Sequence, residues 1–280
     1  MNSDLASIET ATDFDIRFPE AEAGHDQDAE WFEFTFEGER RRLKVHDYAA
    51  LYDVPGLYEA LVYETLGCRS PDRVADLLAL TVADEHRSMG DLRALDLGAG
   101  NGIVAERLAE RGVPAAWGAD LLPEAKAAAE RDRPDAYDGY LVGDFTAFDD
   151  QDLAALRAFD PNLLVVVAAL GYGDIPPSVF AAAWNQIADD GLVAFTIKET
   201  FLSFEADRSG FAWLVKQLRD RRLLRVDARL RFRHRVSIGG EPLHYVAVVG
   251  RKFGAITPEL VETCEAMAID EPPTGDADSA

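Results

Sequence analysis

The chain is poor in the residues that build disulfide frameworks and metal centres. Its 280 residues include two cysteines, Cys68 and Cys264, and five scattered histidines. The cysteines lie far apart in helical patterns, so we expect no disulfide, and the histidines do not cluster, so we expect no metal site. No apolar run approaches the ~20 residues of a membrane span, and the N-terminus lacks the basic and apolar regions of a signal peptide. We therefore expect a cytoplasmic protein with no membrane partner.

Positive charge is also scarce. The 28 Lys and Arg residues face 51 Asp and Glu residues, which gives a net charge of −23, and only 5 of the cations are lysines. Because nucleic-acid binding requires Lys and Arg to neutralise phosphates, this excess of acid argues against DNA or RNA as a partner. The acids are spread along the chain, which fits either a GC-rich genome or adaptation to a salty cytoplasm.

The length and the apolar fraction of 48% favour one large α/β domain with additions at both ends. Residues 1–28 are acidic and lack apolar periodicity, so we expect a mobile tail. Residues 29–90 predict a hairpin around Glu37-Gly38 followed by a helical cap. Residues 91–255 form the expected core, and residues 256–280 are expected to hold a helix and a second mobile tail.

The most informative segment is 94–108. An apolar strand ends in Asp96, and a turn with glycines at positions 98, 100 and 102 leads directly into an amphipathic helix. Glycine allows positive φ and removes the Cβ that would keep a ligand away from the backbone. Such a strand–turn–helix unit at the carboxyl edge of a parallel sheet binds nucleotide-like ligands. A dinucleotide-binding turn would have a small residue at position 103, where this chain has Ile103, and this argues against NAD or FAD.

Four further apolar segments follow this turn at suitable intervals. The first ends in Asp120, the second is Tyr140–Phe145, the third is Leu163–Asp174 and the fourth is Asp189–Thr196. In this order the five segments resemble the motifs of the class I S-adenosylmethionine-dependent methyltransferases, over roughly residues 46 to 252. Alternating segments at 224–236 and 243–249 resemble the antiparallel hairpin that closes the sheet in this family.

The resemblance implies a Rossmann-like α/β fold with S-adenosylmethionine as cofactor. The expected sheet has seven mainly parallel strands, an antiparallel last strand, helices on both faces and an N-terminal cap. In the family, an acid at Asp120 accepts hydrogen bonds from the ribose hydroxyls, an acid at Asp144 binds the adenine amine, and the residue at Phe145 covers the ring. The full set implied for the cofactor is Tyr48, Asp96, Gly98, Ala99, Gly100, Gly102, Asp120, Leu121, Asp144, Phe145 and Ala168.

Each of these assignments has a purely structural alternative. Asp96 could brace the turn, Gly98 and Gly100 could serve helix–strand packing, and Asp120 could begin the next helix as an N-cap. Asp144 could be a simple loop acid. Tyr48, which with Tyr52 resembles the aromatic segment that lies over the cofactor in small-molecule members, could be a packing aromatic.

Acceptor-side residues are expected in the loops after the fourth and fifth strands. These loops place Tyr172, Asp174, Lys198 and Glu199 near the pocket, with Asp174 and Glu199 as candidate catalytic bases. His234 falls on the apolar face of its strand and is expected to be a core histidine. One face of the same strand carries arginines that could bind an anionic acceptor, bind a partner's acids or simply be solvated: Arg225, Arg229, Arg231, Arg233 and Arg235.

We therefore expect methyl transfer to a small-molecule acceptor by in-line displacement. The N-terminal segment is long enough to close over a modest ligand. The alternatives are a methyltransferase acting on a protein side chain, a non-catalytic S-adenosylmethionine-binding protein acting through partners, and a nicotinamide-dependent reductase, which Ile103 argues against. The oligomeric state is open, and a homodimer is compatible with the sequence.

Overall fold

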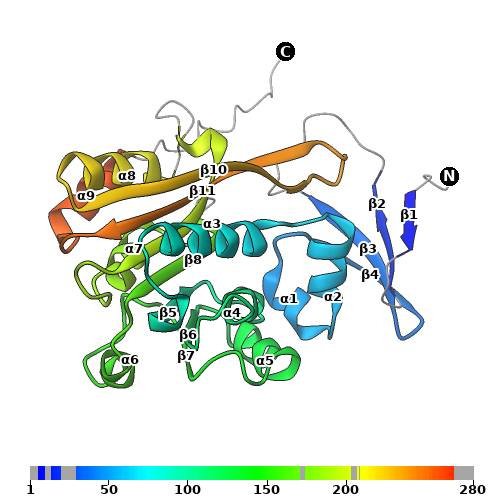
Figure 1. Cartoon of the computed structure of the whole chain (residues 1–280). Coiled ribbons are helices and arrows are strands. Elements are labelled where there is room, and N and C mark those ends of the chain that lie inside the picture. The colour runs from blue at the N-terminus through cyan, green and yellow to red at the C-terminus, as the bar shows by residue number, and fades with distance from the viewer. Residues whose placement is uncertain are drawn as a thin grey trace, which may run out of the picture.

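The computed structural model describes residues 6–9, 14–19, 30–170, 174–202, 207 and 209–267. These residues form a four-stranded antiparallel sheet near the N-terminus and a seven-stranded sheet, and Figure 1 shows the small sheet at one end of the molecule, beyond the tip of the long hairpin of the large one. None of the described helices is long and apolar enough to span a bilayer.

The large sheet has the order β10-β11-β9-β8-β5-β6-β7. Its strands are β5 (Arg93–Leu97), β6 (Ala115–Asp120), β7 (Gly139–Val142), β8 (Leu163–Leu170), β9 (Leu192–Lys198), β10 (Leu224–Val236) and β11 (Pro242–Lys252). Strands β5 to β9 pair in parallel, whereas β11 pairs antiparallel with both β9 and β10. The predicted seven-stranded, mainly parallel sheet with an antiparallel last strand is therefore confirmed.

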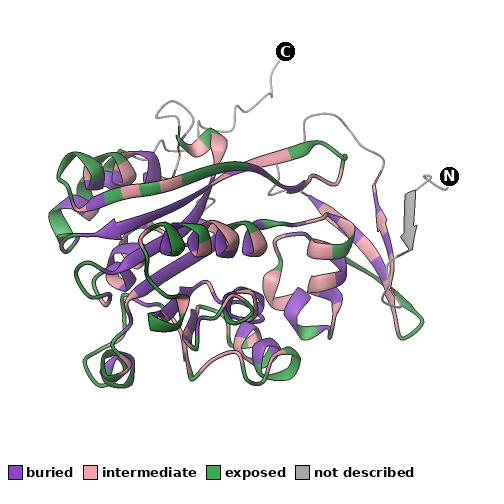
Figure 2. Ribbon diagram, viewed as in Figure 1, coloured by how far each residue is buried: buried purple, intermediate pink, exposed green. Residues whose placement is uncertain are grey.

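Helices cover both faces of this sheet, as predicted. On one face lie α3 (Ser70–Asp84) and α4 (Ile103–Ala109), and on the other α6 (Ala154–Phe159), α7 (Pro177–Trp184), α8 (Phe211–Asp220) and α9 (Pro258–Ala266). Burial on both faces explains why the sequence of β8 is apolar throughout. Leu164 and Val166 pack on one side of the sheet, and Val165 and Val167 pack on the other. Figure 2 shows these strands as buried ribbons between partly exposed helices.

The N-terminal cap begins with the predicted hairpin, formed by β3 (Trp31–Phe36) and β4 (Glu39–Lys44). It continues with α1 (Tyr48–Asp53), α2 (Leu57–Glu59) and a π-helical turn, η2 (Ala60–Thr65). Phe32 and Phe34 alternate onto one face of the small sheet and pack against Leu51, Leu57 and Leu61 of the helices. Ala125 and Ala128 of α5 (Pro123–Asp132) pack against the ring of Tyr52, which joins the cap to the core.

Two expectations about the N-terminal part need correction. The predicted mobile tail at 1–28 contains β1 (Ala6–Glu9) and β2 (Asp15–Phe18), and Ile16 and Phe18 are buried in the cap. Four-residue strands have too few positions for alternation to stand out among acidic neighbours. In addition, α3 belongs to the predicted cap by residue number but packs on the large sheet through Val74 and Leu78. The other residues of 1–28, and those after 267, lie outside the described residues.

Two short 3₁₀ turns complete the described elements. They are η3 (Met89–Asp91), which precedes the central strand β5, and η4 (Glu199–Leu202), which follows β9.

The substitution Ile16→Ala tests whether β2 packs against the cap. Ile16 is 0% exposed, so its truncation leaves a cavity and should lower the free energy of unfolding by about 2–5 kcal/mol in denaturant titrations. Arg17→Ala is the matched control, because the partly exposed Arg17 pairs only with the neighbouring Asp15 and its removal should change the stability little. Equal stability of the two variants would mean that β2 does not pack.

Candidate functional site

A cavity of about 630 Å³ lies at the carboxyl ends of the central strands, under the cap helices. Its wall joins the glycine turn after β5, the ends of β6 and β7, the helices of the cap and the β10–β11 hairpin. The cavity therefore brings together most of the residues that the sequence assigned to a cofactor.

The glycine turn requires its glycines for two different reasons. Gly98, Gly100 and Gly102 all have positive φ, at 74°, 52° and 86°. A Cβ on Gly100 would lie 2.5 Å from the Tyr52 hydroxyl, so this glycine lets the cap close on the turn. Gly102 is the N-cap of α4 and packs against Ala136 and Tyr137 away from the cavity wall, which gives it a packing role.

The backbone of this turn is held by neighbouring strands. The N–H groups of Gly98 and Ala99 donate to the carbonyl of Ala119, and the Gly100 N–H donates to the Asp120 carboxylate at 2.9 Å. The carbonyl of Ala99 accepts from the Tyr137 hydroxyl at 3.3 Å, and that of Gly100 accepts from the Tyr140 hydroxyl at 3.0 Å. The turn is thus fixed by side chains from β6 and from the region of β7.

Asp120 lies at the end of β6 with its carboxylate on the cavity wall. Burial raises the pKa of Asp120, and the N–H groups of Leu122 and Gly100 partly offset this effect by donating to the carboxylate. The neighbouring Leu121 also lines the cavity but is 62% exposed.

Asp96 lies beneath the turn instead of on the cavity wall. It is 0% exposed and accepts a hydrogen bond from Tyr137 at 2.7 Å, while its Oδ1 has no partner among the described residues. Burial raises the pKa of Asp96 to about 7. Its position matches the bracing alternative more closely than direct ligand contact.

The predicted adenine pair and Ala168 also line the cavity. The exposed Asp144 accepts from the amide and the hydroxyl of Thr146 at 2.8 and 2.7 Å, and these bonds lower its pKa. Phe145 is buried against Phe148. Ala168 has a φ of 57° where β8 is irregular, and its amide donates to Thr196 at 2.7 Å.

A row of tyrosines forms the cap side of the wall. The ring centroids of Tyr48 and Tyr52 are 6.3 Å apart, those of Tyr52 and Tyr58 4.9 Å, and those of Tyr58 and Tyr63 5.8 Å. Burial raises the pKa of all four hydroxyls, so they are neutral. The sequence indicated Tyr48 and Tyr52 as residues of the lid but gave no sign of Tyr58 and Tyr63. Residues five apart share a face in a π-helical turn but not in an α-helix, so an α-helical pattern cannot reveal this pair.

The far end of the cavity is formed by His234, Arg235 and Tyr245. The Nδ1 atom of His234 is 2.7 Å from the Ser70 hydroxyl, and its ring stacks on Tyr245 at 4.1 Å. Burial lowers the pKa of His234 to about 3, so the imidazole is neutral. The predicted buried, partnered histidine is confirmed, although it also lines the cavity.

The prediction that Arg235 lies on the arginine face of β10 is wrong. The register shifts between Arg233 and Arg235, and this irregularity turns Arg235 inward. Arg235 is 4% exposed, and its Nη2 lies 2.9 Å from the buried carboxylate of Glu30. The other four arginines of the predicted face remain exposed.

The residues predicted for the acceptor side do not all lie on the cavity wall. Asp174 lines the cavity, whereas Glu199 and Lys198 do not. Glu199 pairs with Arg231 at 2.6 Å, and Lys198 lies over the ring of Phe201 at 5.4 Å. Tyr172 lies outside the described residues.

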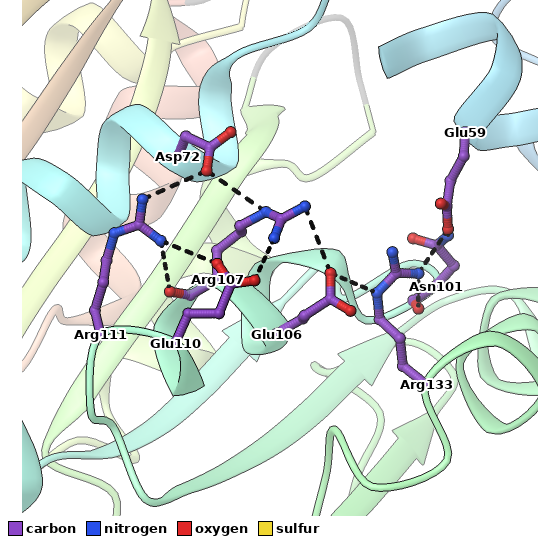
Figure 3. Close-up of polar contacts among 8 residues, drawn as sticks. All are labelled: Glu59, Asp72, Asn101, Glu106, Arg107, Glu110, Arg111 and Arg133. Atoms are coloured by element: carbon purple, nitrogen blue, oxygen red, sulfur yellow. Dashed lines mark hydrogen bonds and ion pairs between the residues drawn. The ribbon is translucent and has the colours of Figure 1, made fainter. Parts of the chain in front are cut away.

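An ion-pair network that the sequence did not predict connects the cap to the turn (Figure 3). Glu59 of α2 binds both Asn101, in the glycine turn, and Arg133, after α5, at 2.9 and 2.7 Å. Arg133 also pairs with Glu106 of α4 at 3.3 Å. The network continues through Arg107 of α4, and through Glu110 and Arg111 just after this helix, to Asp72 of α3. The two contacts of Glu59 join residues 42 and 74 positions apart, so no local pattern signals them.

Because the pKa of Asp96 is raised, the free energy of unfolding should depend on pH in a way that can be measured. The folded protein keeps this proton up to a pH of about 7, whereas in the unfolded chain the pKa of an Asp is about 3.8. Stability from this group therefore falls as the pH rises from about 4 to about 7 and is constant above that interval. Asp96→Asn keeps an acceptor for Tyr137 but cannot titrate. In the ligand-free protein, the free energy of unfolding of the wild type should fall relative to this variant by up to roughly 4 kcal/mol across the interval. Parallel pH profiles of the two proteins would show that Asp96 is ionised in the fold.

No family model matches the sequence, and no curated protein matches it. Among solved structures, the chain is similar to an S-adenosylmethionine-dependent methyltransferase from Clostridium acetobutylicum ATCC 824, with a TM-score of 0.48, 12% identity and coverage of 70% of this chain and 98% of that one. It is also similar to the N-methyltransferase NodS from Bradyrhizobium japonicum WM9 in complex with S-adenosylhomocysteine, with a TM-score of 0.45, 17% identity and coverage of 65% and 86%. A magnesium protoporphyrin IX methyltransferase from Synechocystis PCC 6803 gives a TM-score of 0.43, 10% identity and coverage of 65% and 83%.

The order and direction of the strands in the large sheet also indicate the fold. Its central strand β5 is followed by the glycine turn, and β11 alone reverses direction between β9 and β10. The large sheet therefore gives the chain a Rossmann-like α/β fold, with seven mainly parallel strands and helices on both faces.

Proposed function

We propose that the protein transfers a methyl group from S-adenosylmethionine to a small-molecule acceptor. The observation that carries the proposal is the single cavity that joins the glycine turn, Asp120 and the Asp144-Phe145 pair to the tyrosine wall and Asp174. Cofactor and acceptor would thus share one cavity.

The residues present suit this cofactor. The Asp120 carboxylate lies at a strand end on the cavity wall, where it can accept from the ribose hydroxyls. Phe145 offers an apolar surface for the adenine, and Asp144 adjoins it as an acceptor for an exocyclic amine. The bulky Ile103, also on the wall, stands where a dinucleotide turn needs a small residue.

When bound, S-adenosylmethionine supplies a methyl group on an electrophilic sulfonium. The remaining task of the protein is to exclude water and to hold the acceptor in line with the methyl group. The neutral tyrosines of the cap form one side of the wall, with Tyr48 as the proposed lid contact. Asp174, which adds negative charge near Tyr48 and Tyr245, is the proposed group that orients or deprotonates the acceptor.

The proposal of a small acceptor is supported by the cap and by charge. The volume of about 630 Å³ falls within the range of ligand pockets, about 300–1,000 Å³, and the cap helices cover the cavity. A net charge of −23 opposes a polyanion. Methylation of a protein in place of a small molecule would favour the side-chain alternative, and cofactor binding without turnover on any acceptor would favour the non-catalytic one.

Asp120→Asn tests the cofactor. Wild-type protein should bind S-adenosylhomocysteine but not NADH in calorimetry. The variant should bind S-adenosylhomocysteine more weakly by about 1.5–3 kcal/mol, because a carboxamide accepts fewer hydrogen bonds than a carboxylate. Asp135→Asn is the control, since the exposed Asp135 lies off the cavity wall. Tight NADH binding, or unchanged affinity in Asp120→Asn, would refute the assignment.

Asp174→Asn and Glu199→Gln separate the two candidate bases. Both changes are near-isosteric and should spare S-adenosylhomocysteine binding. Only Asp174 lines the cavity, so Asp174→Asn should slow single-turnover methyl transfer by about 10²-fold or more, whereas Glu199→Gln should react like the wild type. The measurement needs an acceptor found by screening small molecules. If Asp174→Asn also reacts at the wild-type rate, positioning of the acceptor alone accounts for catalysis.

A further inference from the structure

Three polar groups at the far end of the cavity have no hydrogen-bond partner among the described residues. They are Nε of Arg235 and the hydroxyls of Tyr48 and Tyr245. In contrast to the unpartnered Oδ1 of Asp96, none of these atoms is completely enclosed by protein. Because all three residues line the cavity, the groups are accessible to a ligand that enters it.

The three groups also lie close to one another. Burial raises the pKa of both tyrosine hydroxyls, and the positive charge of Arg235 is near enough to oppose this shift at each of them. Within the described part of the chain, Arg235 donates from Nη2 to Glu30 at 2.9 Å and from Nη1 to the carbonyl of Val236 at 2.8 Å. These two bonds fix the guanidinium and leave some of its N–H donors for a ligand.

The charges at this end of the cavity favour an uncharged ligand group. The side chains of Arg235 and Glu30 are 5% and 3% exposed, so the guanidinium charge is already offset inside the protein. A ligand carboxylate would add a second negative charge beside Glu30 and near Asp174, whose charge acts on both tyrosines. A ligand ammonium group would bring a positive charge and N–H donors against the donors of Arg235.

A carbonyl oxygen suits this arrangement of donors. It has two lone pairs and no proton, so it can accept from a guanidinium N–H and from a tyrosine hydroxyl at the same time. The adjoining walls are aromatic, because the rings of Tyr58 and Tyr63 lie 5.8 Å apart and His234 stacks on Tyr245. Such ring faces favour a flat, aromatic body for the molecule that carries the carbonyl group.

We infer that the methyl acceptor is an uncharged aromatic molecule with a carbonyl group, whose oxygen accepts hydrogen bonds from Arg235 Nε and from the Tyr245 hydroxyl. The inference rests on the proposed function and names its class of acceptor. The sequence allowed the arginines of β10 to bind an anionic acceptor. Of those five, Arg235 alone lines the cavity, and Glu30 already offsets its charge.

Three probes of similar size test the preferred charge of the ligand. At neutral pH, para-hydroxybenzamide, para-hydroxybenzoate and para-hydroxybenzylamine carry an uncharged, a negative and a positive group on the same phenol ring. In NMR titrations of the full chain saturated with S-adenosylhomocysteine, the amide should bind at least about tenfold more tightly than either ion. Tighter binding of an ion, equal binding of the three probes, or binding of none would overturn the inference. Failure to bind S-adenosylhomocysteine would instead refute the proposed function.

Arg235→Lys and Arg233→Lys form a matched pair on one strand. Both keep the positive charge, but Arg235→Lys removes the Nε–H and the planar fork, whereas Arg233 is exposed and lies off the cavity wall. Arg235→Lys should weaken para-hydroxybenzamide binding about 10- to 100-fold, the range for a hydrogen bond to a charged group. Binding of S-adenosylhomocysteine and of para-cresol, which lacks the carbonyl group, should be kept. Arg233→Lys should bind all three like the wild type. Equal weakening of para-cresol and the amide would show that Arg235 only shapes the cavity, contrary to the inference.

Tyr245→Phe tests the second donor with little risk to the fold. The variant loses a hydroxyl that has no partner in the described chain and keeps the ring that stacks on His234. It should weaken para-hydroxybenzamide binding about 3- to 10-fold, the range for a hydrogen bond between uncharged groups, and leave para-cresol binding unchanged. Unchanged affinity for the amide would contradict the assignment of Tyr245.

Discussion

The hydrogen bond from the Gly100 amide to the Asp120 carboxylate, at 2.9 Å, is the contact on which the rest of the site depends. It joins the turn after β5 to the end of β6, and so it sets the spacing between the two neighbouring strand ends. The same carboxylate also accepts from Leu122, which begins the approach to α5. One side chain thus contacts the turns that follow β5 and β6 and also lies on the cavity wall, so a substitution at Asp120 would affect both the fold and the cavity.

The parts of the molecule that could be predicted from sequence are those built from local patterns. The apolar run of β8, the glycine turn and the alternation of β10 and β11 each carry their signal within a dozen residues, and each lies where predicted. Asp120, Asp144 and Phe145 share one cavity for the same reason, because they follow strands whose ends meet at one edge of the sheet.

The missed features depend on contacts between distant segments. Arg235 faces inward because a register shift in β10 lets it reach Glu30, 205 positions away, and strict alternation assumes that no such shift occurs. Glu59 and Asn101 meet only after the cap folds over the turn. Glu199 follows β9 as expected, but its side chain turns to Arg231 on the outside of the sheet. Position along a strand was predictable, whereas the direction of a side chain beyond the strand end was not.

The π-helical turn η2 restricts how this protein can vary in length. On its N-terminal side Glu59 is anchored to Asn101, and after it the amide of Arg69 donates to the carbonyl of His234 at 2.8 Å. The segment therefore spans two fixed points. Loss of one residue would restore a regular α-helix and rotate Tyr63 away from Tyr58. The loop at Gly239-Gly240 lies on the surface, and its length is not restricted in this way. Insertions and deletions between Glu59 and Arg69 should consequently be selected against, even though few of these residues would touch a ligand.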